Sequence, residues 1–340
     1  MKKKIVFIAK YIFFLAVGAC FFWLAIKNED TSEIISTLKN ADYKWLLFST
    51  VFMLASHLFR ALRWNQLIST LNYKTKTFTT FYAVMVGYFV NLAIPRLGEI
   101  ARCGVLAKYK KMPADSLLGT VIAERAFDII SLSIILLVTF FSQINFLSDF
   151  LSEYIITPLI SNFSNKTFAF IAISGIIVLI VLIIIIFYKV FLKKIKKYPF
   201  YFKITQIING FLKGIKTIKY IKHKKLFMLY SVLIWLMYFM TIYFCFFAID
   251  DTSSLSAIDA LTVLAMGSVG ILVPTPGGIG AYQYAVTITL VGLFKIDGIS
   301  ASTFANSVYF TQWFLIIIFG ALSWGILFLS HKKTQKNERS

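Results

Sequence analysis

The chain has 340 residues, of which 59% are hydrophobic and 15% are charged. Soluble globular domains are about 45–50% apolar and about 25% charged, so this composition excludes a soluble enzyme, a disordered chain and a disulfide-stapled secreted domain. Apolar runs long enough to cross a bilayer as helices recur along the chain. The sequence therefore predicts an all-α, polytopic integral membrane protein, with one transmembrane domain over residues 1–330 and a basic tail at 331–340.

Nine apolar segments are the candidate spans. In chain order they are Ile5–Ile26, Trp45–Leu62, Phe78–Ile94, Leu117–Phe141, Phe168–Val190, Leu226–Ile249, Ala257–Val273, Ile279–Phe294 and Thr303–Leu329. The first follows three lysines, as in a signal peptide, but its apolar run continues past the weak cleavage box. We interpret it as an uncleaved anchor. About eight full spans and one re-entrant segment are expected.

The basic residues give the topology, because loops on the cytoplasmic side carry an excess of lysine and arginine. Residues 60–77 and 189–225 are basic and free of acidic residues, whereas residues 142–167 and the loop after Ile249 are acidic. This pattern places both termini in the cytoplasm. The net charge of +20 then indicates anionic lipid rather than nucleic acid as the partner.

One segment breaks the charge pattern. If residues 78–94 crossed fully, the basic residues from Arg96 to Lys111 would face outward. The conflict disappears if residues 78–108 enter from the cytoplasm, break near Pro95 and return. We therefore predict a re-entrant hairpin around Asn91–Gly98, which is tolerated only where it is buried in protein or lines a wet cavity. Two full crossings remain the alternative, although residues 97–108 reach only about 18 Å as a helix.

The hairpin carries the first candidate site. Since proline favours a first helical position, we expect a half-helix to begin at Pro95. Arg96, Glu99 and Arg102 would then share one face, and their surplus positive charge at a helix N-terminus suits a lipid phosphate. The alternative is an arginine pair that snorkels to the interface and sets topology. The candidate substrate-binding residues here are Asn91, Pro95, Arg96, Gly98, Glu99 and Arg102.

A second cluster lies early in the next span, at Glu124, Arg125 and Asp128. Each ionised residue deep in a membrane costs about 2.5–3.5 kcal/mol on insertion scales, so three within five positions are not expected to face lipid. We expect them to point into the bundle and to pair with the hairpin arginines or line a cavity. A purely structural ion-pair cluster is equally compatible with the pattern.

The third feature is a break between two apolar runs, from Pro274 to Gln283. Its prolines and glycines cannot continue a helix, and we expect its backbone donors to be free for a ligand. The alternative is a tight interhelical turn. The candidate residues here are Pro274, Pro276, Gly277, Gly278, Gly280, Tyr282 and Gln283, with Ser268 as a supporting polar group.

The two breaks occupy corresponding places in two halves of the chain, which is the sequence indication of an inverted-repeat transporter. By the charge pattern the first unit begins inside and the second outside.

Residues 193–225 form a basic amphipathic linker, expected on the inner leaflet as a topogenic anchor or as a collector of anionic lipid. The cysteines and histidines share no metal spacing, so no metal or cofactor is predicted. His57, His223 and His331 are interpreted as topological or headgroup-facing residues.

Three motifs in this order resemble one family. Pro95-Arg96-Leu97-Gly98-Glu99 with Arg102, then Glu124-Arg125 with Asp128, then Pro274-x-Pro276-Gly277-Gly278-x-Gly280 are similar to the flippase-like family, the transmembrane region of lysylphosphatidylglycerol synthases. The resemblance covers residues 5–330 and implies an inner-membrane protein that moves a lipid between leaflets. Many members carry a carboxylate shortly after the Gly-Gly-x-Gly run, where this chain has Ala281, Tyr282 and Gln283.

We therefore expect a lipid translocase of the stand-alone type, not an enzyme, because no synthase domain follows the last span. The sequence contains no G-x-x-x-x-G-K-[ST] motif, so movement would be passive or driven by an ion gradient. Its partners would be membrane phospholipids of anionic type, with a homo-oligomer or a separate synthase as further partners. The alternatives are an intramembrane enzyme that modifies lipid phosphates and a non-catalytic partner of a lipid or cell-envelope synthase.

Overall fold

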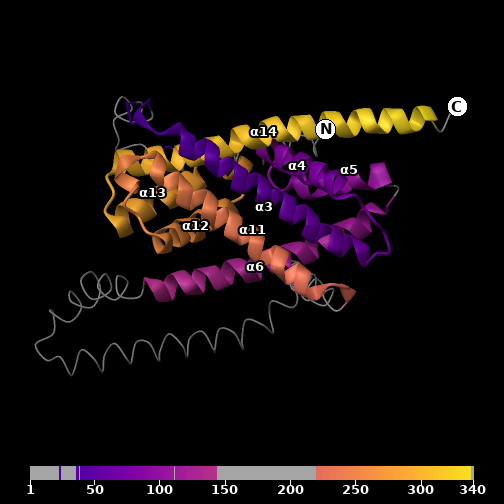
Figure 1. Ribbon diagram of the computed structural model, residues 1–340, viewed down its shortest axis with the longest axis horizontal. Coiled ribbons are helices and arrows are strands. Elements are labelled where there is room, and N and C mark those ends of the chain that lie inside the picture. Colours follow the sequence, from indigo (N-terminus) through magenta and orange to yellow (C-terminus); the bar gives the residue numbers. More distant parts are fainter. Residues whose placement is uncertain (1–22, 24–35, 38, 111, 144–219, 338–340) are drawn as a thin grey trace, which may run out of the picture. The chain divides into compact units, whose positions relative to one another are not determined.

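The computed structural model describes residues 23, 36–37, 39–110, 112–143 and 220–337, and every regular element among them is helical. The predicted all-α class is thus confirmed (Figure 1). The helices of this part are α3 (Tyr43–Ser69), α4 (Thr77–Ala93), α5 (Leu97–Lys110), α6 (Ala114–Ser142), α11 (Lys224–Cys245), α12 (Ala257–Leu272), α13 (Ala281–Phe294) and α14 (Gly298–Asn337). Short 3-10 turns are η3 (Phe246–Ala248), η4 (Asp250–Thr252) and η5 (Pro276–Gly278).

Four helical segments in the described part are long and apolar enough to cross a bilayer: Tyr43–Ser69, Lys224–Ala248, Pro276–Phe294 and Gly298–Ser330. Two shorter apolar helices are Thr77–Ala93 and Ala257–Leu272. Each predicted span from Trp45 onward that the structure describes corresponds to one of the helices above. Outside the described residues lie the predicted span Ile5–Ile26 except Trp23, the predicted span Phe168–Val190 and most of the linker 193–225.

Helices α3 and α11 run side by side and form one large helix pair of the fold (Figure 1). Aromatic side chains join them at one end, where Trp45 stacks on Phe244 with ring centroids 5.9 Å apart and Phe52 stacks on the same ring at 5.0 Å. Offset aromatic pairs of this kind add to the stability that burial provides. The Asp42 side chain accepts a hydrogen bond from the Lys44 N–H and so caps the start of α3.

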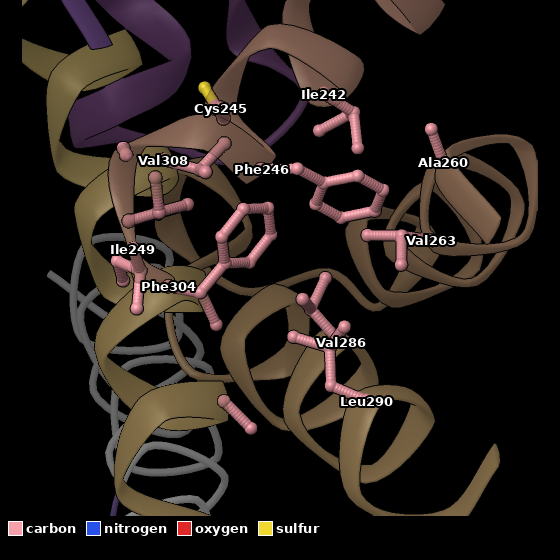
Figure 2. Close-up of a cluster of buried hydrophobic side chains, with 14 of the residues drawn as sticks. Ile242, Cys245, Phe246, Ile249, Ala260, Val263, Val286, Leu290, Phe304 and Val308 are labelled. Atoms are coloured by element: carbon pink, nitrogen blue, oxygen red, sulfur yellow. The ribbon is translucent and has the colours of Figure 1, made fainter. Parts of the chain in front are cut away.

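A buried apolar cluster holds the end of α11 against α12, α13 and α14 (Figure 2). Phe246 and Phe304 lie at its centre, with ring centroids 5.3 Å apart. Val263 from α12 and Val286 from α13 pack into the same cluster. This packing fixes the helices on both sides of the second Pro/Gly break.

Helices α4 and α5 form a tight antiparallel hairpin. With 17 and 14 residues, they are about 25 Å and about 21 Å long, and a hydrocarbon core is about 30 Å thick. Gly87 and Gly98 lie in contact where the two helices meet, and the Asn91 Oδ1 atom accepts the Gly98 N–H at 2.7 Å. The predicted break near Pro95 is confirmed, and the short helices fit a re-entrant hairpin.

The predicted start of the half-helix at Pro95 is wrong. Helix α5 begins at Leu97, and Arg96 adopts the left-handed conformation, with φ of 64°. That conformation reverses the chain between the two helices and places Arg96 outside the helical repeat. Arg96, Glu99 and Arg102 therefore do not share one helical face as expected.

Helices α12 and α13 form a second hairpin of short helices around η5. Gly270 packs on the backbone of Ala281, and Gly267 packs on the ring of Tyr282. The predicted break between Pro274 and Gln283 is confirmed. The turn η5 also packs against α4, so the second break adjoins the helix that leads into the first.

Candidate functional site

Helix α6 brings its charged residues into the protein interior. The Trp64 indole N–H donates to the Thr120 hydroxyl at 2.8 Å, and the rings of Phe127 and Phe227 pack edge to face at 4.8 Å. These contacts bind α6 to α3 and α11. Glu124 is consequently fully buried and Asp128 is 12% exposed, as predicted for residues that point into the bundle.

The principal partners of the two carboxylates come from α3. The Arg60 Nη1 atom lies 2.6 Å from the Glu124 Oε1 atom and 2.8 Å from the Asp128 Oδ2 atom. The Arg63 Nη2 atom lies 2.5 Å from the Asp128 Oδ1 atom. Both arginines are buried, and the Arg60 guanidinium also donates to the Tyr238 hydroxyl at 3.2 Å. This inner cluster, Arg60, Arg63, Glu124 and Asp128, is a compact set of charge-assisted hydrogen bonds.

The hairpin contributes one buried arginine to the cluster. The Arg102 Nη2 atom lies 3.1 Å from the Glu124 Oε2 atom, which confirms that α6 pairs with a hairpin arginine. The Arg102 guanidinium stacks over the Trp64 ring at 4.6 Å. Neither the Arg102 Nη2 atom nor the Glu124 Oε2 atom makes a well-directed hydrogen bond. The contact with α5 is therefore less well formed than the contacts with α3.

The outer edge of the cluster is open to solvent or lipid. Arg125 is 41% exposed and lies 3.4 Å from Asp128 and 3.9 Å from Glu99, which is 27% exposed. Next to these residues is a recess of about 10 Å³, lined by Val84, Gly87, Tyr88, Asn91, Gly98, Glu99, Arg102 and Arg125. It has room for about one water molecule. Charged and polar groups of both hairpin helices and of α6 thus converge on one small recess.

The complete cluster carries a surplus of positive charge. Four arginines, Arg60, Arg63, Arg102 and Arg125, face three carboxylates, Glu99, Glu124 and Asp128. Buried charges in proteins are normally paired. The unpaired positive charge lies at the exposed edge, where Arg125 and Arg102 meet the recess, and it suits an anionic ligand. Arg96 is exposed and is not among the residues that line the recess.

The second break is a closed turn. Gly277, Gly278 and Gly280 have positive φ angles, which explains the glycines there. The Gly278 N–H donates to the Thr275 carbonyl at 3.1 Å, and the Gly280 N–H donates to the Gln283 Oε1 atom at 2.8 Å. The expectation of free backbone donors is therefore wrong for Gly278 and Gly280, because the turn itself uses their N–H groups. The Tyr309 hydroxyl also donates to the Gly277 carbonyl at 3.0 Å.

Sequence reasoning missed the α3 side of the cluster. Arg60 and Arg63 were assigned to a basic cytoplasmic loop, but α3 continues to Ser69 and buries both. The available signal was their spacing of three residues, which places both side chains on one face of a helix, as the spacing of four residues does for Glu124 and Asp128. His57, interpreted as topological or headgroup-facing, is buried with its ring 4.4 Å from that of Tyr88.

Within the part of the chain that the structure describes, no group of three His, Cys, Asp or Glu side chains is placed to hold a metal ion. Cys103 and Cys245 are buried free thiols.

Comparison with known proteins identifies relatives of the chain. Residues 11–322 match the family described as the lysylphosphatidylglycerol synthase TM region. A UPF0104 membrane protein of Methanocaldococcus jannaschii is 25% identical over 130 residues, which are 37% of this chain and 36% of that protein. The glycosyltransferase AglD of Haloferax volcanii is 28% identical over 105 residues, 31% of this chain and 17% of that protein. The similarity thus spans well under half of each relative. No solved structure matches.

Proposed function

This chain belongs to the lysylphosphatidylglycerol synthase TM region family, and from this premise we propose that it moves an anionic phospholipid between the leaflets of the bacterial inner membrane without ATP. The observation that carries the proposal is the surplus arginine charge at the edge of a buried ion cluster. A lipid phosphate supplies the missing negative charge. Arginine suits this task because its guanidinium can hold phosphate oxygens through two parallel hydrogen bonds.

In this mechanism the inner cluster keeps its contacts, and the outer residues Arg125, Glu99 and Arg102 exchange partners. Arg60 and Arg63 hold Glu124 and Asp128 through short contacts of 2.5–2.8 Å. Arg125 has only longer contacts, of 3.4 Å and more. An arriving phosphate therefore displaces the Glu99 carboxylate from Arg125 and also binds Arg102. The contacts within the inner cluster remain unchanged.

The two hairpins supply the passage in this proposal. The first hairpin consists of two helices too short to span a bilayer, the second pairs the short helix α12 with the longer segment Pro276–Phe294, and η5 packs against α4. Irregular backbone at membrane depth persists where it is buried in protein or lines a wet cavity. A headgroup that moves along the contact between the hairpins stays close to polar groups while its acyl chains remain in lipid.

The engaged state of the carboxylates favours transport over lipid-phosphate chemistry. A metal-dependent enzyme would use Glu124 and Asp128 as its carboxylate pair. Both are already bound by Arg60 and Arg63 inside the protein. A metal ion would have to displace two buried guanidinium groups, which makes these carboxylates a poor metal site.

The proposal is tested by lipid exchange in vesicles. Purified protein is reconstituted with phosphatidylglycerol labelled on an acyl chain, and the label in the outer leaflet is quenched chemically. We expect exchange with wild type, and an at least tenfold slower rate with Arg125→Gln. Arg96→Gln is the matched control, because Arg96 is an exposed arginine near the recess that does not line it. Equal rates for the two variants would refute the assignment of the phosphate to Arg125.

A further inference from the structure

We propose that the second break binds the neutral, hydroxyl-bearing part of the lipid headgroup, such as a glycerol or a sugar, while the first break holds the phosphate. This inference rests on the proposed function and names its substrate class. It assigns a recognition role to Thr275, Tyr282 and Gln283, which flank η5.

Buried polar atoms without partners point to a ligand at this turn. The Thr275 Oγ1, Tyr282 hydroxyl and Gln283 Nε2 atoms are buried and have no hydrogen-bond partner. Their side chains are 3%, 5% and 0% exposed. Buried polar groups are almost always hydrogen-bonded in native proteins, because an unpaired one is costly. Three such atoms within nine residues of one turn indicate a partner that completes them.

The chemistry of these three atoms selects the partner. Gln283 has already committed its Oε1 atom to the Gly280 N–H, so its free group is an NH₂ donor. A donor needs an oxygen acceptor, which a glycerol or sugar hydroxyl provides and an ammonium group does not. The tyrosine and threonine hydroxyls can donate or accept. Residues 274–283 contain no charged side chain, so nothing in this turn neutralises an amine headgroup.

Aromatic rings form the wall of the same turn. Trp313 lies against Gly277, where an added Cβ would come within 2.9 Å of its ring. The Tyr309 ring packs 5.5 Å from both Trp313 and Tyr282. Aromatic faces beside amide and hydroxyl groups give a surface that is apolar on its faces and polar at its edges. Such a surface suits the C–H and O–H groups of a polyol.

The position of η5 links the two breaks to one headgroup. Because η5 packs against α4, it adjoins the helix that supplies Gly87, Tyr88 and Asn91 to the charged recess. In this proposal a headgroup with its phosphate at Arg125 reaches the neutral turn with its hydroxyls across α4.

The test is equilibrium lipid binding to the purified full-length protein, measured by native mass spectrometry. The probes are phosphatidylglycerol, phosphatidic acid and phosphatidylethanolamine with identical acyl chains. We expect wild type to bind phosphatidylglycerol at least about fivefold tighter than the other two, as one or more hydrogen bonds to the glycerol would produce. Tyr282→Phe should reduce this preference severalfold, and Gln283→Glu should shift it toward phosphatidylethanolamine.

The control is Thr289→Val on the same helix, since the Thr289 hydroxyl already donates to the Ala285 carbonyl at 2.7 Å. It should leave the preference unchanged. Equal binding of all three lipids by wild type, or an unchanged preference in Tyr282→Phe, overturns the inference. Selective binding without any exchange in vesicles would instead refute translocation and leave this recognition site intact. Exchange in vesicles without any headgroup preference would support translocation and refute the recognition site at the second break.

Discussion

Glu124 shows how strongly the cluster depends on one side chain. It has no exposed surface and lies within 3.4 Å of Arg60, Arg63 and Arg102. Removing one partner of a buried ion pair leaves the others uncompensated in a medium of low dielectric constant. The carboxylate thus holds arginines of two other helices together, whatever the ligand.

Glu124→Gln should therefore lower the free energy of unfolding by about 3–5 kcal/mol. Glu99→Gln is the matched control, because Glu99 is 27% exposed and its contact with Arg125 is 3.9 Å long; exposed pairs contribute about 0–1 kcal/mol. Thermal unfolding in detergent micelles measures both variants. A smaller loss in Glu124→Gln than in Glu99→Gln would contradict the burial argument.

Arg96 gives a second residue-scale prediction. Its φ of 64° is left-handed, and this conformation costs an L-residue other than glycine about 1–2 kcal/mol. Arg96→Gly should raise the unfolding temperature and leave the binding of phosphatidylglycerol unchanged. Arg96→Val should lower the unfolding temperature. A loss of lipid binding in Arg96→Gly would show that Arg96 contributes to binding the lipid phosphate.

The sequence located some of these residues and not others, for a physical reason. Glu124 and Asp128 lie inside an apolar run, so the cost of burial alone indicates that they face the protein interior. Arg60 and Arg63 lie at the end of an apolar run, where positive charge is equally typical of a cytoplasmic loop. Only the continuation of α3 to Ser69 distinguishes the two cases.

At the scale of elements, the α4–α5 hairpin depends on one close glycine contact. A Cβ on Gly98 would collide with the Gly87 carbonyl oxygen and with the Asn91 side chain, whereas a Cβ on Gly104 of the same helix would meet nothing within 4 Å. The hairpin therefore tolerates a side chain at one of these positions and not at the other.

Gly98→Ala should destabilise the protein by about 1–3 kcal/mol or more, as overpacking does. Gly104→Ala should stabilise α5 by up to about 1 kcal/mol, because alanine has the higher helix propensity. The unfolding temperatures of the two variants in detergent give the comparison. Equal effects would show that α4 and α5 do not pack as described.

The re-entrant path of the first hairpin is tested by cysteine labelling. Lys76 and Lys108 flank it and are exposed, and Ser254 precedes α12 in the acidic segment. In a background without the three native cysteines, Lys76→Cys and Lys108→Cys should react from the cytoplasmic side with an impermeant maleimide. Ser254→Cys should react from the opposite side. Labelling of positions 76 and 108 from opposite sides would mean that the segment crosses the membrane.

Both breaks could be predicted because proline and glycine act locally, through φ and the missing N–H. The start of α5 could not, since the left-handed Arg96 is imposed by the packing of α4 on α5 and by the Asn91 cap on Gly98. The same holds for η5, whose turn uses its own donors. Composition cannot reveal which donors a turn will satisfy itself.

At the scale of the whole molecule, two hairpins interrupted by Pro/Gly breaks adjoin each other, because η5 of the second packs against α4 of the first. The flanks of the first are basic and those of the second carry Asp250, Asp251 and Asp259. If the hairpins enter from opposite sides, as this charge pattern predicts, their breaks approach each other within the membrane. Paired broken segments of this kind are typical of inverted-repeat transporters. The family assignment agrees with the motif order read from the sequence.

The most direct test of the account is lipid exchange by the wild-type protein in ATP-free vesicles. Phosphatidylglycerol and phosphatidylcholine carry the same acyl-chain label, and each is assayed with and without a proton gradient. The account predicts that phosphatidylglycerol from both leaflets becomes accessible to the quencher, faster than phosphatidylcholine and without ATP. If neither lipid exchanges under any of these conditions, the protein is not a lipid translocase, and its buried ion cluster serves another purpose.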